Sequence, residues 1–380
     1  MAPFPPDVIV IGAGVIGCAC AFELAAAGAR VTVFDLRHIG QGASQASAGV
    51  LAPYIEGHQS GPLRALGRRS LDLFDGLVQR VMEASGRTVQ YTRGGTLEVA
   101  LESDHADNLR RSGDALHQEG VAAHWVDATD LRAVEPMVAT SALGGLLIDM
   151  HGFVGVPEFT DALAAAAMRA GARFALDARV VSVASTADQR VIVTTENGPS
   201  VGDYVVLAAG SWAGQVRIEG VTDPVAVKPV RGQLLHLSWP TTQPLRHVLW
   251  GTDCYIVPWL NGRVLVGATV EDAGFDERAT AAGVRDLLEA GCALVPHLWQ
   301  ASFEEVRVGL RPASPDGLPI VGKSEVVPGM IYATGHYRNG VLLTPLTASL
   351  VKSLVMGDDA DPALDVLRPS RLSLGRRAAL

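Results

Sequence analysis

The chain has 380 residues, of which 48% are hydrophobic and 19% charged, so it is long enough for two to three domains with sizeable cores. Forty acidic residues against 31 basic ones give a formal net charge of −9, and the scattered basic residues offer no electrostatic support for non-specific nucleic-acid binding. The four cysteines form no CxxC pair and have no ligand-like spacing with histidine. We therefore expect neither a disulfide scaffold nor a metal centre, and we expect a cytoplasmic location.

The N-terminal region has the pattern of a strand, a helix and a second strand. Val8–Ile11 is a short apolar run that predicts a buried strand, and Ala19–Ala27 predicts a helix that Gly28 closes. Val31–Phe34 predicts another buried strand, which ends at Asp35. These segments together predict a βαβ unit at the start of the chain.

Residues 8–29 contain only one charged residue, Glu23, and are long enough to cross a membrane. The glycines at 12, 14 and 17 interrupt this run, β-branched residues gather at its start and alanines fill its end. That gradient favours strand, turn and helix over one spanning helix. We expect no membrane span and, because no basic segment precedes the run, no secretory signal.

The rest of the chain alternates helical and strand patterns. Helices are predicted over Asp72–Met82, Asp107–Glu119, Pro157–Ala170, Val284–Ala293 and Val341–Val355. Strands are predicted over Thr96–Leu101, Gly144–Ile148, Arg179–Val183, Val191–Thr195, Tyr204–Leu207, Leu234–Leu237, Cys254–Val257, Val264–Val266 and Ile331–Ala333. Turn signals at Asn197-Gly198 and Asn261-Gly262 separate neighbouring strands.

Alternating strands and helices at both ends, with a strand-rich middle, predict two interleaved domains of α/β class. We expect a Rossmann-type dinucleotide-binding domain in three segments, 1–85, 150–220 and 311–365. We expect a mostly antiparallel α+β substrate domain from 86–149 and 221–310, followed by a loosely held tail over 366–380. No Pro/Ser-rich linker marks a boundary between these segments.

The first chemical signal is a GxGxxG motif directly after the first predicted strand. It consists of Gly12, Ala13, Gly14, Val15, Ile16 and Gly17. Gly12 allows a tight turn, Gly14 lets a pyrophosphate approach the backbone, and Gly17 lets helix and strand pack closely. Asp35 ends the second strand, where a carboxylate accepts hydrogen bonds from the adenosine ribose. This arrangement predicts a dinucleotide site but does not separate NAD from FAD.

The segment from Gly40 to Gly49 contains only small or polar side chains. Such a segment can lie flat along an extended ligand and offer backbone donors. The alternative, when the segment is taken alone, is a flexible surface loop.

A set of further motifs extends over nearly the whole chain in a fixed order. Besides residues 8–17, Asp35 and the segment 42–50, the set comprises Leu207–Ala213, Lys228–Leu235, Asp253–Pro258, Val266–Thr269, Gly309–Asp316 and Gly335–Leu342. With these motifs the chain resembles the D-amino-acid oxidase family of flavoproteins, most closely its glycine oxidase (ThiO-like) branch. The ordered set is more specific for this oxidase family than for the substrate.

The resemblance implies a glutathione-reductase-like domain that binds FAD without a covalent bond, since Gly309–Asp316 holds no cysteine. The implied FAD contacts come from the GxGxxG motif, from the segment after Asp35, from a position beside the adenine and from two loops around the flavin. They are Gly12, Ala13, Gly14, Val15, Ile16, Gly17, Asp35, Leu36, Ala43, Ser44, Ala48, Gly49, Val50, Val180, Ala209, Gly210, Trp212, His336, Arg338, Asn339, Gly340, Val341 and Leu342.

The resemblance also implies the groups that hold the substrate. Arg311 matches the carboxylate-binding arginine, and its planar guanidinium suits both carboxylate oxygens. Tyr255 matches the tyrosine whose hydroxyl supports that clamp, and Arg338 matches a second substrate-contacting arginine. Without the resemblance, these three residues could be a surface ion pair, a core tyrosine and a solvated loop arginine. Orientation of the substrate is the main catalytic device that such a site needs.

Three positions depart from the glycine oxidase pattern. Val50 and Val270 stand where methionines can occur, and Asp253 replaces a histidine. We count all three among the candidate substrate contacts. Less bulk near the flavin would leave room for a substrate larger than glycine, and Asp253 could complement an amine or be a turn residue.

The implied reaction is oxidation of the Cα–N bond of glycine or an N-substituted glycine. Hydride passes to flavin N5, the imine hydrolyses to glyoxylate plus ammonia or an amine, and oxygen yields hydrogen peroxide. Three alternatives stay open: an oxidase for a bulkier N-carboxymethyl amino acid in a specialised pathway, a D-amino-acid dehydrogenase with another electron acceptor, and a non-catalytic flavin-binding scaffold. The family also implies a homo-oligomer. None of the residues implied to contact the flavin is a lysine, the residue with which sarcosine-type relatives activate oxygen.

Overall fold

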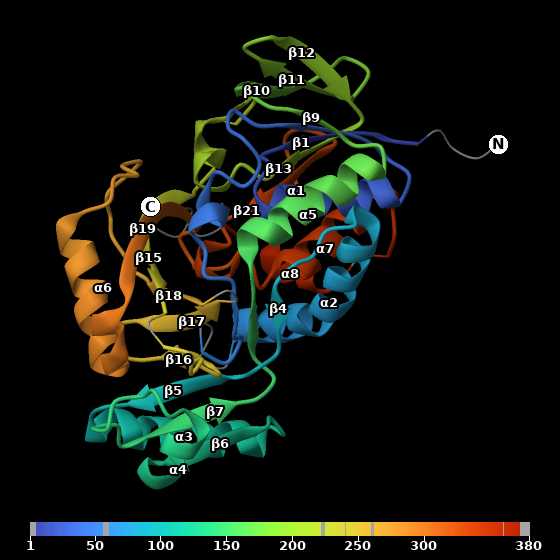
Figure 1. The fold of residues 1–380 in the computed structure, drawn as a ribbon. Helices are drawn as coiled ribbons and strands as arrows, with labels where there is room; N and C mark the ends of the chain where they lie inside the picture. The colour runs from blue at the N-terminus through green and yellow to red at the C-terminus, as the bar shows by residue number, and fades with distance from the viewer. Residues whose placement is uncertain are drawn as a thin grey trace, which may run out of the picture.

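The computed structural model describes residues 5–55, 61–221, 225–239, 241–259, 262–359 and 361–372. Its two main sheets lie in different parts of an elongated molecule (Figure 1). The helices are α1 (Val15–Ala26), α2 (Pro62–Ser85), α3 (Ser103–Gln118), α4 (Ala128–Val134), α5 (Val156–Arg169), α6 (Ala281–Leu294), α7 (Thr344–Met356) and α8 (Ala363–Leu367). Short 3-10 helices span Ala43–Ala46 (η1), Gly210–Gln215 (η2), Pro296–Gln300 (η3) and Tyr337–Asn339 (η4).

The first sheet has six strands in the order β20-β21-β13-β1-β2-β9. They are β1 (Asp7–Ile11), β2 (Arg30–Phe34), β9 (Arg173–Ala175), β13 (Tyr204–Leu207), β20 (Ile320–Lys323) and β21 (Met330–Thr334). All neighbours are parallel except β20 and β21. Successive residues of a strand point to opposite faces of the sheet. Val8 and Val10 pack against α1, α2, α5 and α7, whereas Ile9 and Ile11 pack under a small second layer.

That second layer is a four-stranded sheet in the order β12-β11-β10-β14. Its strands are β10 (Val180–Ser185), β11 (Val191–Thr195), β12 (Gly198–Gly202) and β14 (Arg217–Ile218). A three-stranded sheet has the order β3-β8-β4 and consists of β3 (Val50–Leu51), β8 (Gly152–Val154) and β4 (Tyr91–Thr92). The chain forms these short strands where it passes from one of the larger sheets to the other.

The other large sheet has eight strands in the order β19-β15-β18-β17-β16-β5-β7-β6. They are β5 (Thr96–Ala100), β6 (Ala123–Asp127), β7 (Gly144–Ile148), β15 (Lys228–Ser238), β16 (Val248–Trp250), β17 (Tyr255–Trp259), β18 (Arg263–Gly267) and β19 (Ser302–Ala313). Figure 1 shows α6 beside β15 and β19, and α3 and α4 beside β5–β7. The sheet therefore combines two separated segments of the chain, 96–148 and 228–313, and the division into domains stays a prediction.

Comparison with the predicted elements confirms the α/β class and most strands. Val191–Thr195, Tyr204–Leu207 and Gly144–Ile148 are strands with the predicted ends. The first helix begins earlier than predicted, at Val15, because the last residues of the glycine motif already belong to it. The hairpin predicted at Asn261-Gly262 joins β17 and β18, and Asn261 lies outside the described residues.

Other elements differ more from the prediction. The helix predicted over Asp72–Met82 extends over 62–85 as α2, because Pro62 starts it and Gly86 ends it with a left-handed φ of 64°. The last long helix starts at Thr344 rather than Val341. The strand β19 has no counterpart among the predicted strands.

The C-terminal segment is held more firmly than expected. Residues 366–372, which we expected in a loose tail, include buried Leu367 and Arg371, whose guanidinium donates to Asp316 at 2.8 Å and to the carbonyl oxygen of Leu318 at 2.8 Å. The prediction of a loose tail is wrong for these residues. The remaining positions, 373–380, lie outside the described residues.

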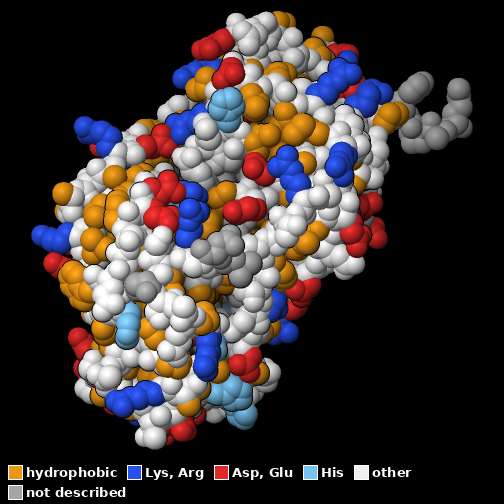
Figure 2. Space-filling model, in the orientation of Figure 1, with side chains coloured by type: hydrophobic (Ala, Val, Ile, Leu, Met, Phe, Trp, Pro, Cys, Tyr) orange, Lys and Arg blue, Asp and Glu red, His pale blue; other side chains and the backbone are white. Residues whose placement is uncertain are grey.

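The surface mixes charges of both signs. On the face in Figure 2, acidic and basic side chains are interspersed and no large area carries one sign. Among the helices placed by the structure, none has both the length and the apolar character that crossing a bilayer demands.

His236 on β15 couples the stability of this fold to pH. Its side chain is 1% exposed, and its ring lies edge-on to Trp259 with centroids 5.5 Å apart. Burial, assisted by nearby Arg307 and Arg263 and opposed by Glu305 and Glu304, lowers the pKa of His236 from 6.5 to about 4. The native protein therefore keeps this imidazole neutral at a pH where the unfolded chain takes up a proton.

We expect the free energy of unfolding to fall as the pH drops from 6.5 towards 4, because only the unfolded state binds this proton. The contribution of His236 is about 1.4 kcal/mol per pH unit in that window. Urea unfolding at about pH 6.5 and about pH 5 measures the slope. His236→Gln should reduce this slope by the contribution of one proton, because the variant has no imidazole to titrate. An identical slope in the variant would contradict the assignment.

Candidate functional site

The carboxyl ends of β1, β13 and β21 border a cavity of about 430 Å³. We call this the first cavity. Ligands of open α/β sheets bind at this edge of the sheet. Nineteen of the predicted cofactor and substrate residues line it: Gly12, Gly14, Val15, Ile16, Asp35, Leu36, Ala43, Ser44, Ala48, Val180, Ala209, Gly210, Trp212, Tyr255, Arg311, His336, Arg338, Gly340 and Val341.

The glycine turn brings backbone and helix α1 close to this cavity. Gly12 has a φ of +109°, and a Cβ there would lie 2.4 Å from the carbonyl oxygen of Ala208 on the neighbouring segment. A Cβ at Gly17 would lie 1.9 Å from the carbonyl oxygen of Gly12. The Val15 N–H donates to Ser44 Oγ at 3.0 Å. Glycines are therefore required at both positions, and the α1 N-terminus faces a space suited to a pyrophosphate.

Asp35 supplies the carboxylate expected beside a ribose. Its Oδ2 accepts from the Ala13 N–H at 2.6 Å, and its Oδ1 accepts from the Arg37 N–H at 2.8 Å. These two bonds fix the carboxylate at the end of β2, on the lining of the cavity. This cradle and carboxylate fit the ADP part of FAD.

The small-residue segment after Gly40 lies along the same cavity. Ala43 and Ala46 form the ends of η1, which packs against β19. A Cβ added at Gly309 on β19 would lie 2.9 Å from the Cβ of Ala46, so both segments need small residues to approach each other. The segment therefore forms a wall of the cavity, in contrast to the alternative of a detached surface loop.

Arg37 is a cavity residue that the sequence patterns did not identify. Its guanidinium lies 4.4 Å from the centroid of the Trp212 ring and donates to Glu277 at 3.0 and 2.7 Å. Glu277 comes from the loop before α6, so this pair joins the two halves of the molecule next to the cavity. Ser211 and Thr334 also line the cavity and were not predicted. The sequence marks Arg37 only by its position two residues after Asp35. No residue near it in the sequence identifies Glu277 as its partner.

At the other end of the first cavity, residues from three distant segments meet. Tyr255 from β17, Arg311 from β19 and Arg338 from η4 all line it. Arg311 Nη1 donates to the carbonyl oxygen of Thr269 at 2.9 Å, and among the described residues Arg311 forms no ion pair with a carboxylate. Its charge is therefore held in place by a neutral acceptor and is left to balance an anion in the cavity.

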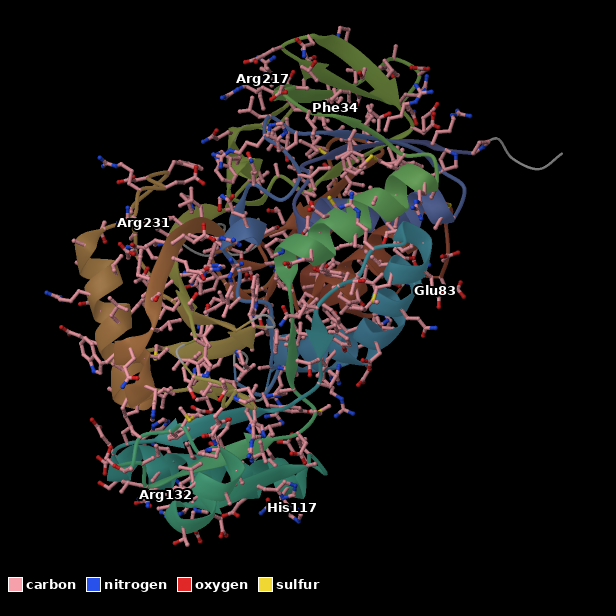
Figure 3. The ribbon with its side chains drawn as sticks, viewed as in Figure 1. Phe34, Glu83, His117, Arg132, Arg217 and Arg231 are labelled. Carbon is pink, nitrogen blue, oxygen red and sulfur yellow. The ribbon has the colours of Figure 1, made fainter. Side chains whose placement is uncertain are left out.

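The backbone that holds Arg311 is itself supported by a polar network. Thr269 Oγ1 accepts from the Gln233 N–H at 2.8 Å and donates to Glu271 at 2.5 Å. Glu271 in turn accepts from the buried Arg231 at 2.6 Å. Figure 3 shows Arg231 near one end of α6, where β15 and β19 meet the loop that carries this network. Glu271 is thus neutralised by Arg231 and does not compete for Arg311.

Gly232 makes room for the Arg311 guanidinium. It faces β19 from β15, and a Cβ there would lie 2.4 Å from both Nη atoms of Arg311. Because a guanidinium at the end of a flexible side chain can move aside, the substitution Gly232→Ala should preserve the fold and displace Arg311. We expect KM for the substrate to rise by about tenfold or more with normal FAD content. Steady-state kinetics and the visible spectrum measure both; Gly262→Ala, a glycine in open space, is the control, and an unchanged KM would contradict the argument.

The His336 ring is buried and contacts α7. Its Nε2 is 3.0 Å from Thr347 Oγ1, and the buried ring has its pKa lowered by desolvation to about 3. The imidazole is therefore neutral and engaged with α7, although the residue lines the cavity.

Eight predicted site residues lie off the cavity lining: Ala13, Gly17, Gly49, Val50, Asn339, Leu342, Asp253 and Val270. Five of these adjoin lining residues in the chain, namely Ala13, Gly17, Gly49, Asn339 and Leu342, and Val50 is two residues from Ala48. Asp253 is exposed, and Val270 is 53% exposed. The structure therefore does not bring Asp253 and Val270 together with Arg311 in the first cavity, and their proposed substrate contacts have no support from its lining.

Comparison with known proteins gives a consistent result. The family model described as "FAD dependent oxidoreductase" (DAO) matches residues 7–354. Glycine oxidase of Geobacillus kaustophilus is 36% identical over 92% of each chain, and the bifunctional protein ThiO/ThiG of Nostoc is 34% identical over 96% of this chain and 55% of its own.

Solved structures agree. The crystal structure of the Geobacillus kaustophilus glycine oxidase has a TM-score of 0.91 at 34% identity, covering 97% of this chain and 99% of the other. Iminodiacetate oxidase of Chelativorans has a TM-score of 0.85 at 28% identity, covering 96% and 99%.

Proposed function

The chain belongs to the DAO family of FAD-dependent oxidoreductases, and on that premise we propose that it oxidises the Cα–N bond of glycine or an N-substituted glycine. When bound, FAD accepts the hydride from Cα and passes the electrons to oxygen, which yields hydrogen peroxide. The observation that carries this proposal is that Arg311 and Tyr255 line the same cavity as the Gly12 turn and Asp35.

Arg311, Tyr255 and Arg338 have different roles in the proposed binding of the substrate. Arg311 presents a guanidinium fork that engages both oxygens of a substrate carboxylate. The Tyr255 hydroxyl would donate to the same carboxylate, and both Tyr255 and Arg338 line the cavity. Holding the carboxylate fixes the orientation of Cα and nitrogen. Such fixed orientation provides a large part of the lowering of the activation barrier.

The names of two relatives support this substrate class. One is a glycine oxidase, and another is an iminodiacetate oxidase, whose name denotes an N-carboxymethyl glycine. Each compound has at least one carboxylate bonded to an amine-bearing CH₂. Loss of hydride from that carbon and of a proton from nitrogen leaves an imine, and addition of water then gives glyoxylate plus ammonia or the released amine.

Anaerobic addition of amines to the FAD-loaded protein tests the proposal. Glycine or sarcosine should bleach the visible flavin absorption, and admission of air should restore it with release of peroxide. A D-amino-acid dehydrogenase would give a different result: D-alanine would bleach the flavin, and a dye would reoxidise it, but admission of air would release no peroxide. A flavin that no amine bleaches would identify a non-catalytic flavin-binding scaffold.

We further propose that the protein acts in the cytoplasm as a homo-oligomer. Among the described residues, all four cysteines are free and buried, which suits a reducing compartment. Trp299 and Phe303 are 71% and 52% exposed near the start of β19, which supports an apolar contact surface. Light scattering on the purified protein measures the oligomeric state.

A further inference from the structure

The loop between β18 and α6, residues 268–280, contacts the wall of the first cavity. Glu277 accepts hydrogen bonds from both Nη atoms of Arg37, at 3.0 and 2.7 Å. The ring of Phe275 lies against the ring of Trp212, with centroids 6.0 Å apart. We call these two contacts the clasp. The proposed reaction gives the clasp no role.

The clasp joins two residues of the cavity wall to two residues outside it. Arg37 and Trp212 belong to the lining of the first cavity, whereas Phe275 and Glu277 do not. Phe275 is 45% exposed, and the Glu277 side chain is 29% exposed. The two loop residues therefore lie on the solvent side of the wall that Arg37 and Trp212 form.

This wall borders the part of the cavity that fits the ADP half of FAD. The Arg37 N–H donates to the carboxylate of Asp35, the group expected beside the ribose, at 2.8 Å. A Cβ added at Gly42 would lie 3.6 Å from the Trp212 ring, so this ring packs beside the small-residue segment of the same wall. Movement of Arg37 and Trp212 away from the cavity would open this side to solvent.

The loop that carries the clasp is anchored to β15. Buried Arg231 donates to the carbonyl oxygens of Asp276 and Arg278, at 3.4 and 3.2 Å. It also pairs with Glu271 at 2.6 Å. Because Asp276 and Arg278 flank Glu277 in the chain, the backbone is fixed on both sides of that carboxylate. The clasp therefore ties the cavity wall to a fixed point.

We propose that the clasp retains the cofactor: FAD leaves when Arg37 and Trp212 swing away from the cavity, and their contacts with Glu277 and Phe275 oppose that movement. A guanidinium that binds both oxygens of a carboxylate is held in one orientation, which favours the closed wall. Glu277 and Phe275 are positioning residues, since they act through the wall. This inference depends on FAD binding and not on the proposed substrate.

The rate of FAD release from the loaded protein tests the proposal. Glu277→Gln should release FAD about fivefold faster, because the pair is charged, bidentate and only partly exposed. Phe275→Ala, at an exposed position where folding is preserved, should also accelerate release. Dilution followed by desalting at timed intervals measures the FAD that remains with the protein by its visible absorbance.

Asp272→Asn is the matched control for Glu277→Gln. It removes the same charge from the same loop, but Asp272 is exposed and pairs with Lys228 at 3.3 Å, away from the clasp. Its release rate should equal that of the unaltered protein within about twofold. If Asp272→Asn accelerates release as much as Glu277→Gln does, the net charge of the loop is the cause and the proposal is wrong.

A double variant separates the clasp from direct contact of Arg37 with the cofactor. Arg37→Leu alone removes the ion pair and also changes the cavity lining. Adding Glu277→Gln to it should cause no further acceleration, because the pair is already broken. Effects that multiply in the double variant, or unchanged release from Glu277→Gln, would overturn the inference. A flavin that glycine does not bleach contradicts the proposed function and leaves these release rates unaffected.

Discussion

Arg311→Ala is expected to lower kcat/KM for glycine by about 100-fold or more, mostly through KM, with normal FAD content. The Arg311 guanidinium lines the first cavity and donates to a neutral acceptor, the carbonyl oxygen of Thr269. Removing it leaves a substrate carboxylate desolvated without a charged partner, which is the costly case for a buried ion. Steady-state kinetics and the visible spectrum of the purified variant provide the measurement.

Two further substitutions separate charge from geometry at this position. Arg311→Lys keeps the charge but loses the planar fork, so it should recover only part of the lost kcat/KM. Arg263→Ala removes a half-exposed arginine of the same sheet, which pairs with Glu304 at 2.9 Å, and should leave KM unchanged. Unaltered kinetics of Arg311→Ala would remove the central support for the proposed substrate.

Gly12→Ala is expected to abolish stoichiometric FAD binding and to lower stability. The new Cβ would lie 2.4 Å from the carbonyl oxygen of Ala208, which is main chain and cannot move aside cheaply. The φ of +109° adds strain of about 1–3 kcal/mol for any residue with a Cβ. The backbone would relieve the clash and the φ strain by opening the turn that faces the cofactor, and FAD binding would be lost. The FAD-to-protein ratio after desalting and thermal unfolding measure the two effects.

Gly28→Ala is the matched control for that experiment. Gly28 also has a positive φ, +94°, but a Cβ there would meet nothing within 4 Å. It should therefore show the backbone strain alone, with FAD retained. Full FAD occupancy in Gly12→Ala, or equal FAD loss in both variants, would show that the turn at Gly12 does not hold the cofactor.

The parts of the fold that could be predicted from the sequence depend on local patterns. The strand, glycine turn, helix and strand that end at Asp35 are contiguous, and their order follows from hydrophobic periodicity and the conformational freedom of glycine. The cofactor cavity could be anticipated for the same reason. Residues 191–195 and 204–207 were equally clear, because their apolar runs are bounded by polar turns.

The parts that could not be predicted depend on contacts between distant segments. The strand β19 carries Arg311, but its first four residues are exposed at the edge of the sheet, so no continuous apolar run marks the strand. Its register with β15 is what brings Gly232 against Arg311. Arg37 and Glu277 are 240 residues apart, and only the folded chain pairs them.

The place of β21 in the six-stranded sheet has a consequence for biosynthesis. This strand, Met330–Thr334, pairs with β13 inside the sheet, and the residues just after it, including His336 and Arg338, line the first cavity. During translation the nascent chain cannot complete its nucleotide site until these late residues have left the ribosome. We therefore expect ribosome-stalled or prematurely terminated chains that stop before Met330 to emerge without the flavin and to depend on chaperones until synthesis is finished.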